Sequence, residues 1–327
     1  MRGKLLRIFH KSCEVKNVLP VNFRQADTEL FAKDQKINLP QSGFYLLEKV
    51  FVTDLGIIYK NFSPLKENIV CYDIDFKNYR LRYLFKSYLQ FRRFAYKGRQ
   101  CIIIFDNYSG PNGFAHWICD GLTRLMEVND ILDRYTVIVP AYFKEEAIYR
   151  DSMALFDIKD IHYLPKNSFT YFKALHFPSP VGDTGNFHPE NVKKLRALVT
   201  NKIPVVAGPA RNIYISRQKA KRRFIQNETE VGGLLAKYNF ETIYLEDYSF
   251  TQQINLIANA ANIISIHGAA LAMLLFAQTG ASVMELRGQK DAVNNMYYLL
   301  ASVCGLHYYY LNCESILHSA TGNNFDL

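Results

Sequence analysis

The stretch IISIHGAALAMLLF, from Ile263 to Phe276, begins as an apolar strand and continues as an apolar helix. His267 and Gly268 lie in the bend between the two. A helix start exposes unpaired backbone N–H groups and about half a positive charge, which suits a phosphate. The alternative is a tight turn whose small residues serve packing alone. The stretch therefore predicts a strand–turn–helix unit with a candidate phosphate site at the turn.

Strands and helices are predicted to alternate on both sides of this stretch. Before it, QCIIIFDN, YTVIVP and IHYLP indicate buried strands, separated by helices from about His116 to Asn129 and over FKEEAIYRDSMALF. After a turn-rich segment, Pro180–Arg211, the predicted strands are NIYIS, ETIYL, NIISIH, SVMEL and HYYYL. The helices between them are predicted over NETEVGGLLAKY, SFTQQINLIANA, GAALAMLLFAQ and near Val293–Val303. Continuous apolar strands alternating with helices predict parallel sheets covered on both faces.

This pattern predicts an α/β protein with two Rossmann-like domains and a cleft between them. The expected N-terminal, acceptor-side domain covers residues 1–204, as a β-rich segment 1–99 followed by a Rossmann-like part 100–204. The expected C-terminal, nucleotide-sugar-binding domain covers 205–327. A length of 327 residues agrees with two domains.

The first hundred residues look irregular and β-rich. FYLLEKVFV and GIIYKNF flank a predicted turn at Asp54–Gly56. The basic aromatic stretch Tyr79–Arg99 predicts an amphipathic helix. Its rings can pack inward with the arginines outward, or they can contact lipid or nucleic acid.

Composition limits the class of protein. With 49% hydrophobic and 14% aromatic residues, the chain is not disordered, and its net charge of +9 indicates an anionic partner. The six cysteines show no metal-ligand spacing and several lie in apolar runs, which indicates a reducing compartment. There is neither a signal-peptide pattern nor an apolar run of membrane-spanning length. We therefore expect a cytoplasmic protein, soluble or peripheral on the inner face of the membrane.

Ligands of parallel sheets bind at the carboxyl ends of strands. Four side chains stand at such positions, Arg217, Glu246, His267 and Glu285. One basic residue, one imidazole and two acids at one sheet edge would make a nucleotide site. The alternative for Glu246 is a helix-capping role beside Ser249.

Two segments carry the candidate chemistry. YISRQKAKRRFIQNE places Arg217, Arg222 and Arg223 between a strand and a helix, where arginines can bind a diphosphate bidentately, although basic runs are usually solvated. In SGPNGFAHWICDGLTRL, His116 and Asp120 are four residues apart and share one face of a helix. Either could remove a proton from an acceptor hydroxyl, or the pair could only hold the loop in place.

These motifs, taken in order, carry a resemblance. The chain resembles the family 61 glycosyltransferases, which include plant xylan-decorating enzymes and animal protein O-linked N-acetylglucosaminyltransferases. The resemblance covers about Phe105 to Leu286 through the motifs HWICD, YISR, Arg222–Arg223, NE, EDYSFTQQ, IISIHGAAL and VMEL.

The resemblance implies a GT-B architecture and inverting transfer from a nucleotide-sugar, UDP-linked, to a hydroxyl of a glycan or lipid-linked glycan. By position, Arg217, Arg222 and Arg223 would face the diphosphate and His116 with Asp120 the acceptor. The turn His267–Ala269, with Gly268, and the residues Glu246, Ser249 and Glu285 would line the donor site. Eukaryotic members have an N-terminal membrane helix that this sequence lacks, so we expect a bacterial-type member acting in capsule or lipopolysaccharide synthesis.

No cofactor and no metal are expected. CYDIDF contains Asp73 and Asp75 at the D-x-D spacing of metal-dependent glycosyltransferases, but it lies in the irregular N-terminal region. The alternative function is a catalytically silent glycan- or nucleotide-binding protein of the same fold. Nucleic acid is not expected as a partner, because the basic residues are split between two distant segments. The sequence leaves the donor sugar, the acceptor, the linkage and the oligomeric state open.

Overall fold

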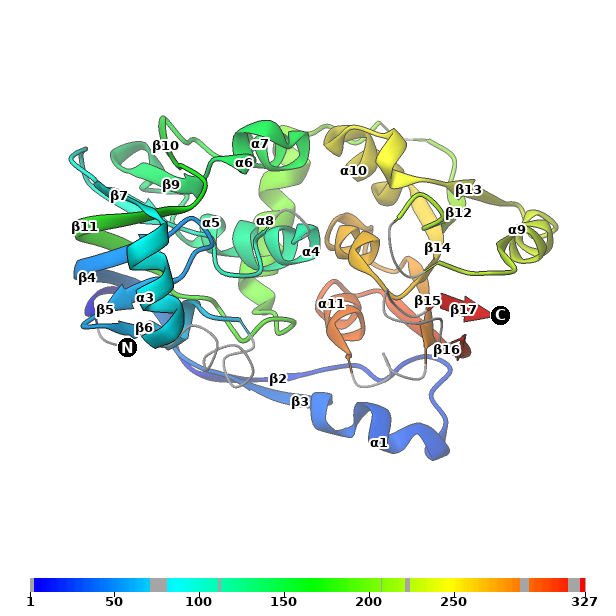
Figure 1. Cartoon of the computed structure of the whole chain (residues 1–327). Coiled ribbons are helices and arrows are strands. Elements are labelled where there is room, and N and C mark those ends of the chain that lie inside the picture. Colours follow the sequence, from blue (N-terminus) through cyan, green and yellow to red (C-terminus); the bar gives the residue numbers. More distant parts are fainter. Residues whose placement is uncertain are drawn as a thin grey trace. The chain divides into compact units, whose positions relative to one another are not determined.

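A computed structural model describes residues 3–70, 81–110, 113–206, 208–220, 224–288, 294–316 and 324–326 (Figure 1). Its contacts divide the chain into two units. Unit 1 consists of Met1–Cys13 and Leu39–Thr184, and unit 2 of Glu14–Asn38 and Gly185–Leu327. Each unit is therefore assembled from two separate pieces of the chain.

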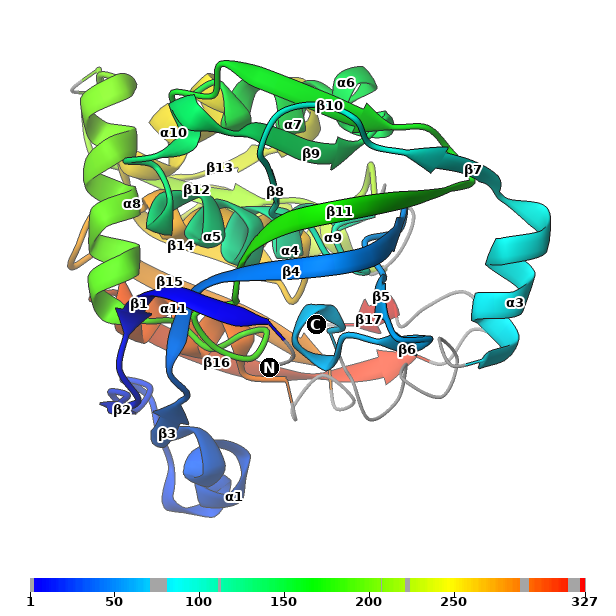
Figure 2. The same ribbon diagram turned by 90° about the vertical axis from the view of Figure 1, so that its left-hand side faces the viewer.

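Unit 1 is built on a mixed sheet, in which the described residues form nine strands. The strand order is β10-β9-β8-β11-β4-β5-β6, with β1 paired to β4 and β7 paired to β11. Figure 2 shows β4 and β11 running side by side across the sheet. The strands are β1 Lys4–His10, β4 Ser42–Thr53, β5 Ile58–Lys60, β6 Ser63–Pro64, β7 Arg92–Ala95, β8 Cys101–Ile103, β9 Thr136–Pro140, β10 Asp160–Leu164 and β11 Ser168–Pro178.

The predicted βαβαβ segment forms part of this sheet. Strands β8, β9 and β10 are parallel, as predicted, and β9 is buried along its whole length. The first predicted helix runs through α4 (Phe114–His116), a π-helical turn and α5 (Leu122–Glu127). The second is divided into α6 (Tyr142–Glu145) and α7 (Ala147–Met153).

The predicted N-terminal extension is not separate from this sheet. The hairpin around Asp54–Gly56 forms as predicted, between β4 and β5, and β4 pairs along most of its length with β11 in antiparallel fashion. The sequence did not indicate β11. This mostly buried strand pairs with β4 on one side and with β8 on the other, so it joins the β-rich segment to the parallel strands. Unit 1 is consequently one mixed sheet, because β11 is parallel to β8 on one side and antiparallel to β4 on the other.

The predicted helix over Tyr79–Arg99 is only partly correct. Helix α3 covers Leu81–Gln90, but Arg92–Ala95 forms β7, which pairs in parallel with β11 from Ser168 to Tyr171. Pairing to a neighbouring strand satisfies the backbone of these residues, and this tertiary interaction overrides the helical pattern of the sequence.

Unit 2 contains the second predicted alternation. Its sheet has the order β13-β12-β14-β15-β16-β17; the first five strands are parallel and β17 is antiparallel to β16. The strands are β12 Arg211–Ile215, β13 Phe240–Ile243, β14 Ala260–Ile266, β15 Ser282–Gly288, β16 His307–Ile316 and β17 Asn324–Asp326. The helices are α8 Pro189–Lys202, α9 Glu228–Ala236, α10 Phe250–Ala258 and α11 Met296–Val303.

Helix α8 corrects the prediction of a turn-rich segment over Pro180–Arg211. It begins with Pro189 in its first turn and has Lys202 in its last, both favourable positions. Four of its side chains are buried, namely Asn191, Val192, Leu195 and Val199. Within the described residues, no helix is both long and apolar enough to cross a membrane.

An N-terminal segment completes unit 2. It contains α1 (Thr28–Phe31) between β2 (Cys13–Lys16) and β3 (Lys36–Leu39), which pair with each other. Phe31 is fully buried, with its ring centroid 5.1 Å from that of Tyr298 and 5.0 Å from that of Tyr310. The Tyr310 hydroxyl donates to Asp27 Oδ2 at 2.5 Å. This segment is therefore part of the core of unit 2 and not a loose arm.

We expect Phe31→Ala to lower the free energy of unfolding by about 3–5 kcal/mol, because it removes a buried ring and leaves a cavity. Urea unfolding followed by circular dichroism measures this change. Val18→Ala, in the same segment but at a side chain that is 74% exposed, is the matched control. Equal stability of the two variants would contradict the packing role of the segment.

Candidate functional site

The first group of candidate residues lies in unit 1, at the start of the helix that follows β8. His116 Nδ1 lies 3.1 Å from Asp120 Oδ2 and 3.1 Å from Thr184 Oγ1. The Thr184 hydroxyl donates to the same Asp120 oxygen at 2.7 Å. The His116 ring also stacks on Tyr108 at 4.9 Å between centroids. The predicted pair is thus part of a three-residue network with an aromatic support.

The local backbone explains why these side chains meet. The π-helical turn Trp117–Gly121 contains Asp120, and such turns frequently occur at functional sites. A Cβ at Gly121 would lie 2.3 Å from the Trp117 ring, and a Cβ at Gly113 would lie 1.8 Å from Tyr108 O. Neither position has room for a side chain. Gly113 lets the helix start close to the loop that carries Tyr108, and Gly121 leaves room for the Trp117 ring.

Buried charges support the same loop. Asp106 accepts hydrogen bonds from the backbone N–H groups of Tyr108 and Ser109, both at 3.0 Å. Arg124 is fully buried, and its Nη1 is 3.9 Å from Asp106 Oδ2. Burial lowers the pKa of Arg124 to about 10 and raises the pKa of Asp106, although the two side chains attract each other.

The network determines which nitrogen of His116 can accept a proton. Nδ1 faces a carboxylate oxygen and a hydroxyl oxygen whose own hydrogen is directed to that carboxylate. The neutral imidazole therefore carries its hydrogen on Nδ1, which leaves the lone pair on Nε2. The side chain of His116 is 27% exposed and that of Asp120 is 14% exposed. The arrangement can present a basic nitrogen to a substrate while Asp120 orients the ring.

Burial alone would lower the pKa of His116, but the hydrogen bond and charge of Asp120 and the charge of Asp106 raise it above its ordinary value. We expect Asp120→Asn to lower this pKa, because the substitution removes the carboxylate charge. Ring resonances of His116 followed by NMR across the pH range measure the shift. His162, whose pKa burial lowers, is the control and should titrate as in the wild type. An unchanged His116 pKa would contradict the network.

The second group lies in unit 2, at the carboxyl ends of β12 and β14. These strands are neighbours, with Ile215 opposite Ser265, so Arg217 and Gly268 follow adjacent strand ends. A Cβ at Gly268 would lie 2.3 Å from Arg217 Nη1 and 2.7 Å from Cζ. The guanidinium therefore lies directly over the glycine backbone, as the strand-end prediction requires.

The helix after Gly268 differs from the prediction. Ala269–Phe276 is a 3₁₀ helix rather than an α-helix, and Leu271 N donates to Gly268 O at 3.0 Å. Six consecutive residues of this segment, Leu271–Phe276, are buried, so the segment is chiefly a packing element. Ala269, at its start, is partly exposed.

A hydrogen bond to Glu285 fixes the His267 side chain. The two side chains are hydrogen-bonded through Nδ1 and Oε1, and the Tyr308 hydroxyl donates to Glu285 Oε2 at 2.5 Å. Burial opposes the charge on Glu285, but His267, Arg287 and Tyr308 outweigh it and lower the pKa of Glu285. His267 is 2% exposed and Glu285 has no exposed surface. Because Glu285 has no exposed surface, it can affect a ligand here only by positioning the His267 side chain.

The predicted donor residues Glu246 and Ser249 lie between β13 and α10. Glu246 is exposed in the short 3₁₀ turn Leu245–Asp247. Ser249 is the N-cap of α10 and forms a capping box with Gln252. Lys219, which follows Arg217 by two residues, forms an ion pair with Asp247 in which Nζ and Oδ1 are 2.5 Å apart. Four predicted residues, Arg222, Arg223, Asp73 and Asp75, lie outside the described residues.

Three residues of the unit 1 network were not predicted from the sequence. Asp106 and Tyr108 follow β8 directly, and the strand-end rule could have found them. Thr184 lies 64 residues from Asp120 in the sequence, and no local pattern signals it.

Histidine, cysteine and acidic side chains are the usual protein ligands of a bound metal. No group of three or more histidine, cysteine or acidic residues within the described ranges could hold a metal ion. The described part of the chain contains five free thiols, Cys13, Cys101, Cys119, Cys304 and Cys313. Burial raises the pKa of Cys101 to about 12, so this thiol is unreactive at neutral pH.

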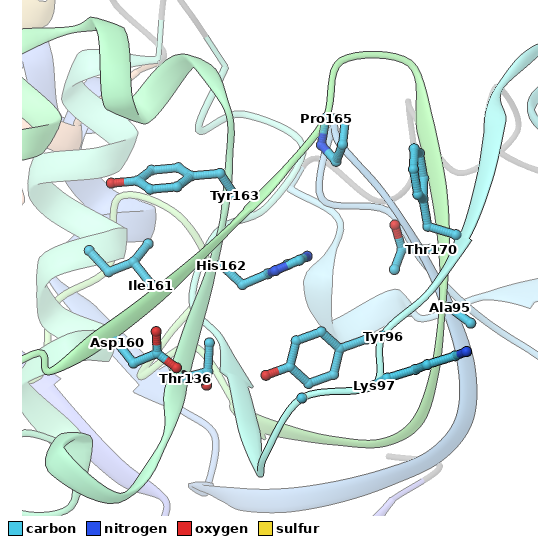
Figure 3. A pocket seen from close by; sticks show the side chains of 12 residues that line it. Ala95, Tyr96, Lys97, Thr136, Asp160, Ile161, His162, Tyr163, Pro165 and Thr170 are labelled. Carbon is cyan, nitrogen blue, oxygen red and sulfur yellow. Dashed lines mark hydrogen bonds between the residues drawn. The ribbon is translucent and has the colours of Figure 1, made fainter.

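A surface pocket of about 430 Å³ lies elsewhere in unit 1. Figure 3 shows the side chains of Tyr96 and His162 directed toward each other in it, with Asp160 and Thr136 beside them. None of the predicted catalytic or donor residues lines this pocket. It is therefore separate from the His116 network.

Comparison with known proteins identifies the class. The Glycosyltransferase 61 family model matches residues 114–284. Since this range is slightly more than half of the chain, the chain belongs to glycosyltransferase family 61. The range contains the candidate residues His116, Asp120, Arg217, His267 and Gly268.

Curated relatives are similar over shorter ranges. Protein O-linked-mannose beta-1,4-N-acetylglucosaminyltransferase 2 of Bos taurus is 30% identical over 158 residues, which is 44% of this chain and 27% of the relative. The Mus musculus protein of the same name is 33% identical over 111 residues, 32% of this chain and 19% of the relative. The Xenopus tropicalis protein of the same name is 42% identical over 72 residues, which is 21% of this chain and 12% of the relative. The matches thus span about a quarter or less of these relatives.

Proposed function

We propose that the protein is an inverting glycosyltransferase in which His116 is the general base. The observation that supports this assignment is the network of His116, Asp120 and Thr184, which places the hydrogen of the imidazole on Nδ1 and leaves Nε2 to accept a proton. In the sequence alone either His116 or Asp120 could be the base, and the geometry favours His116. Asp120 and Thr184 are then positioning residues.

In the proposed step, the hydroxyl oxygen of the acceptor attacks the anomeric carbon of the donor sugar. The hydroxyl proton passes to His116 Nε2 as the new carbon–oxygen bond forms. The bond from the anomeric carbon to the diphosphate breaks, and its electron pair leaves with the diphosphate. Attack from the side opposite the leaving group inverts the anomeric configuration.

Unit 2 is proposed to bind the leaving group. Arg217 offers a planar guanidinium for bidentate contact with a diphosphate, and its position over Gly268 brings that charge to the backbone turn. His267, held by Glu285, is proposed to contact the donor beside this turn. Because fixed cationic groups can stabilise the departing charge, we expect transfer without an added divalent metal.

The substrates are proposed at the level of class. The names of the relatives specify N-acetylglucosamine transfer to O-linked mannose in those proteins. For this chain we propose a UDP-linked sugar, a hexose or pentose, and a glycan or lipid-linked glycan of capsule or lipopolysaccharide synthesis, made in the cytoplasm. The net charge of +9 supports an anionic donor and an anionic carrier.

We expect His116→Ala to lower kcat by about two to four orders of magnitude, because a general base contributes that much. Donor affinity should hardly change. Asp120→Asn should lower kcat less, and EDTA should not affect the wild-type rate. Steady-state kinetics at saturating donor, with Thr184→Val as a further variant of the network, measure these effects. If Asp120→Asn is the more severe change, Asp120 is the base. If only the melting temperature falls, the network is structural.

We expect Gly268→Ala and Arg217→Ala each to weaken binding of a UDP-sugar by about tenfold to a hundredfold, the range for hydrogen bonds to a charged group. A Cβ at Gly268 must displace the guanidinium, so the double variant should bind no more weakly than Arg217→Ala alone. Isothermal titration measures the affinities. Lys219→Gln, at an exposed ion pair, is the control. Additive losses would show that Gly268 acts independently of Arg217.

A further inference from the structure

Helix α3 exposes large apolar side chains that the described residues of unit 1 leave uncovered. Phe85 is 62% exposed and Leu89 is 78% exposed. They are four residues apart and therefore lie on one face of the helix. Tyr88 borders this face: it is 45% exposed, and its ring centroid lies 6.3 Å from that of Phe169 in the core of unit 1. Exposed apolar groups gathered in this way mark an interaction surface more often than isolated ones do.

The side of α3 that carries Leu84 fixes the helix on the sheet. Leu84 is 7% exposed and packs in a cluster with Ile57, Tyr59, Ile69 and Phe169. Because Leu84 already fills this cluster, Phe85 and Leu89 are not needed to attach α3. Their outward position needs a different explanation.

The sequence that forms this face is basic. Residues 81–100 contain six lysines and arginines and no aspartate or glutamate. Lys86, Arg92 and Arg93 are exposed, and the Arg93 guanidinium lies 4.9 Å from the centre of the Tyr88 ring. We call Phe85, Lys86, Tyr88, Leu89, Arg92 and Arg93 the apolar-basic face.

The hairpin of β5 and β6, next to α3, also exposes a large apolar side chain. Its turn residues Asn61 and Phe62 have φ values of 49° and 60°, a left-handed conformation that is unfavourable for a bulky side chain. The Phe62 side chain is nevertheless 81% exposed. Tyr59, on the same hairpin, belongs to the cluster that holds Leu84, so the hairpin and α3 are neighbours. A strained and exposed phenylalanine has no packing role here.

From these observations we infer that the apolar-basic face, with Phe62, docks on an anionic membrane surface. Phenylalanine and leucine side chains enter the boundary between headgroups and acyl chains, tyrosine suits that boundary, and lysine and arginine bind anionic headgroups. A nucleic acid would offer no site for Leu89, and an acidic protein surface would leave both Phe85 and Leu89 in contact with polar groups. This inference goes beyond the proposed function, and vesicle binding can be measured without turnover.

The test is flotation of the full chain with two kinds of vesicle. One is phosphatidylcholine mixed with phosphatidylglycerol in roughly a 2:1 ratio, and the other is phosphatidylcholine alone. We expect the protein to float with the anionic vesicles, less so at high salt, and at least tenfold less with the neutral ones. Failure to float with anionic vesicles overturns the inference and leaves the proposed transfer reaction untouched.

Substitutions in the apolar-basic face test whether these residues contact the vesicle. Phe85→Ser with Leu89→Ser, and Arg92→Gln with Arg93→Gln, should each lower partition at least tenfold, since each basic residue near an anionic surface contributes about fivefold. Leu234→Ser with Tyr238→Ser removes two exposed apolar side chains from unit 2, and Lys193→Gln with Lys194→Gln removes two exposed charges, as matched controls that should float normally. Equal losses in variants and controls overturn the inference.

Phe62→Gly separates binding from folding. Glycine takes the left-handed turn without strain, so the melting temperature should be unchanged or higher while partition falls. Unchanged partition would remove Phe62 from the surface. If the serine variant of α3 instead changes the sedimentation of the protein without vesicles, the face is an interface between copies of the chain, and the membrane inference is wrong.

Discussion

A carboxylate with no exposed surface, Glu285, is the constraint on which unit 2 depends. It lies in β15, between β14 and β16, and an isolated buried charge of this kind would be very costly. His267 from the end of β14 and Tyr308 from β16 are hydrogen-bonded to its two oxygens. Three neighbouring strands are therefore tied together through one carboxylate. The residue before the Gly268 turn is held in place by the same bonds, so the position of the candidate donor site depends on the hydrogen bonding of Glu285.

Unit 1 also contains a buried carboxylate, but this one lies beside a buried arginine. Its buried pair, Asp106 and Arg124, lies beneath the loop that follows β8, and the carboxylate holds the backbone of that loop by accepting its N–H groups. Tyr108 on this loop then stacks on His116. In both units a buried acid arranges the side chains that follow a parallel strand, where ligands of such sheets bind. The surface residues can be adapted to a substrate because the buried acids already fix the backbone.

The family match and the surfaces of this chain occupy different parts of the sequence. The match begins at Phe114, at the start of the helix that carries His116, and it ends at Met284, next to Glu285. The apolar-basic face and the segment that buries Phe31 lie before it. The matched region therefore carries the candidate chemistry, and the preceding region carries the parts that complete the sheet of unit 1 and the core of unit 2.

The sequence by itself determined the parallel strands β8–β10 and β12–β16, because continuous apolar runs flanked by helices have few other solutions. It also determined that Arg217, His267 and Gly268 each follow a strand and that His116 and Asp120 share a helix face, since these relations depend on local spacing. That β12 and β14 are neighbours was decided by the tertiary structure. Only the tertiary structure decided that β11 and β7 pair in the first sheet, that Pro189–Lys202 is a helix of unit 2, and that Thr184 joins His116 and Asp120. These features depend on contacts between residues far apart in the chain, and local periodicity carries no information about them.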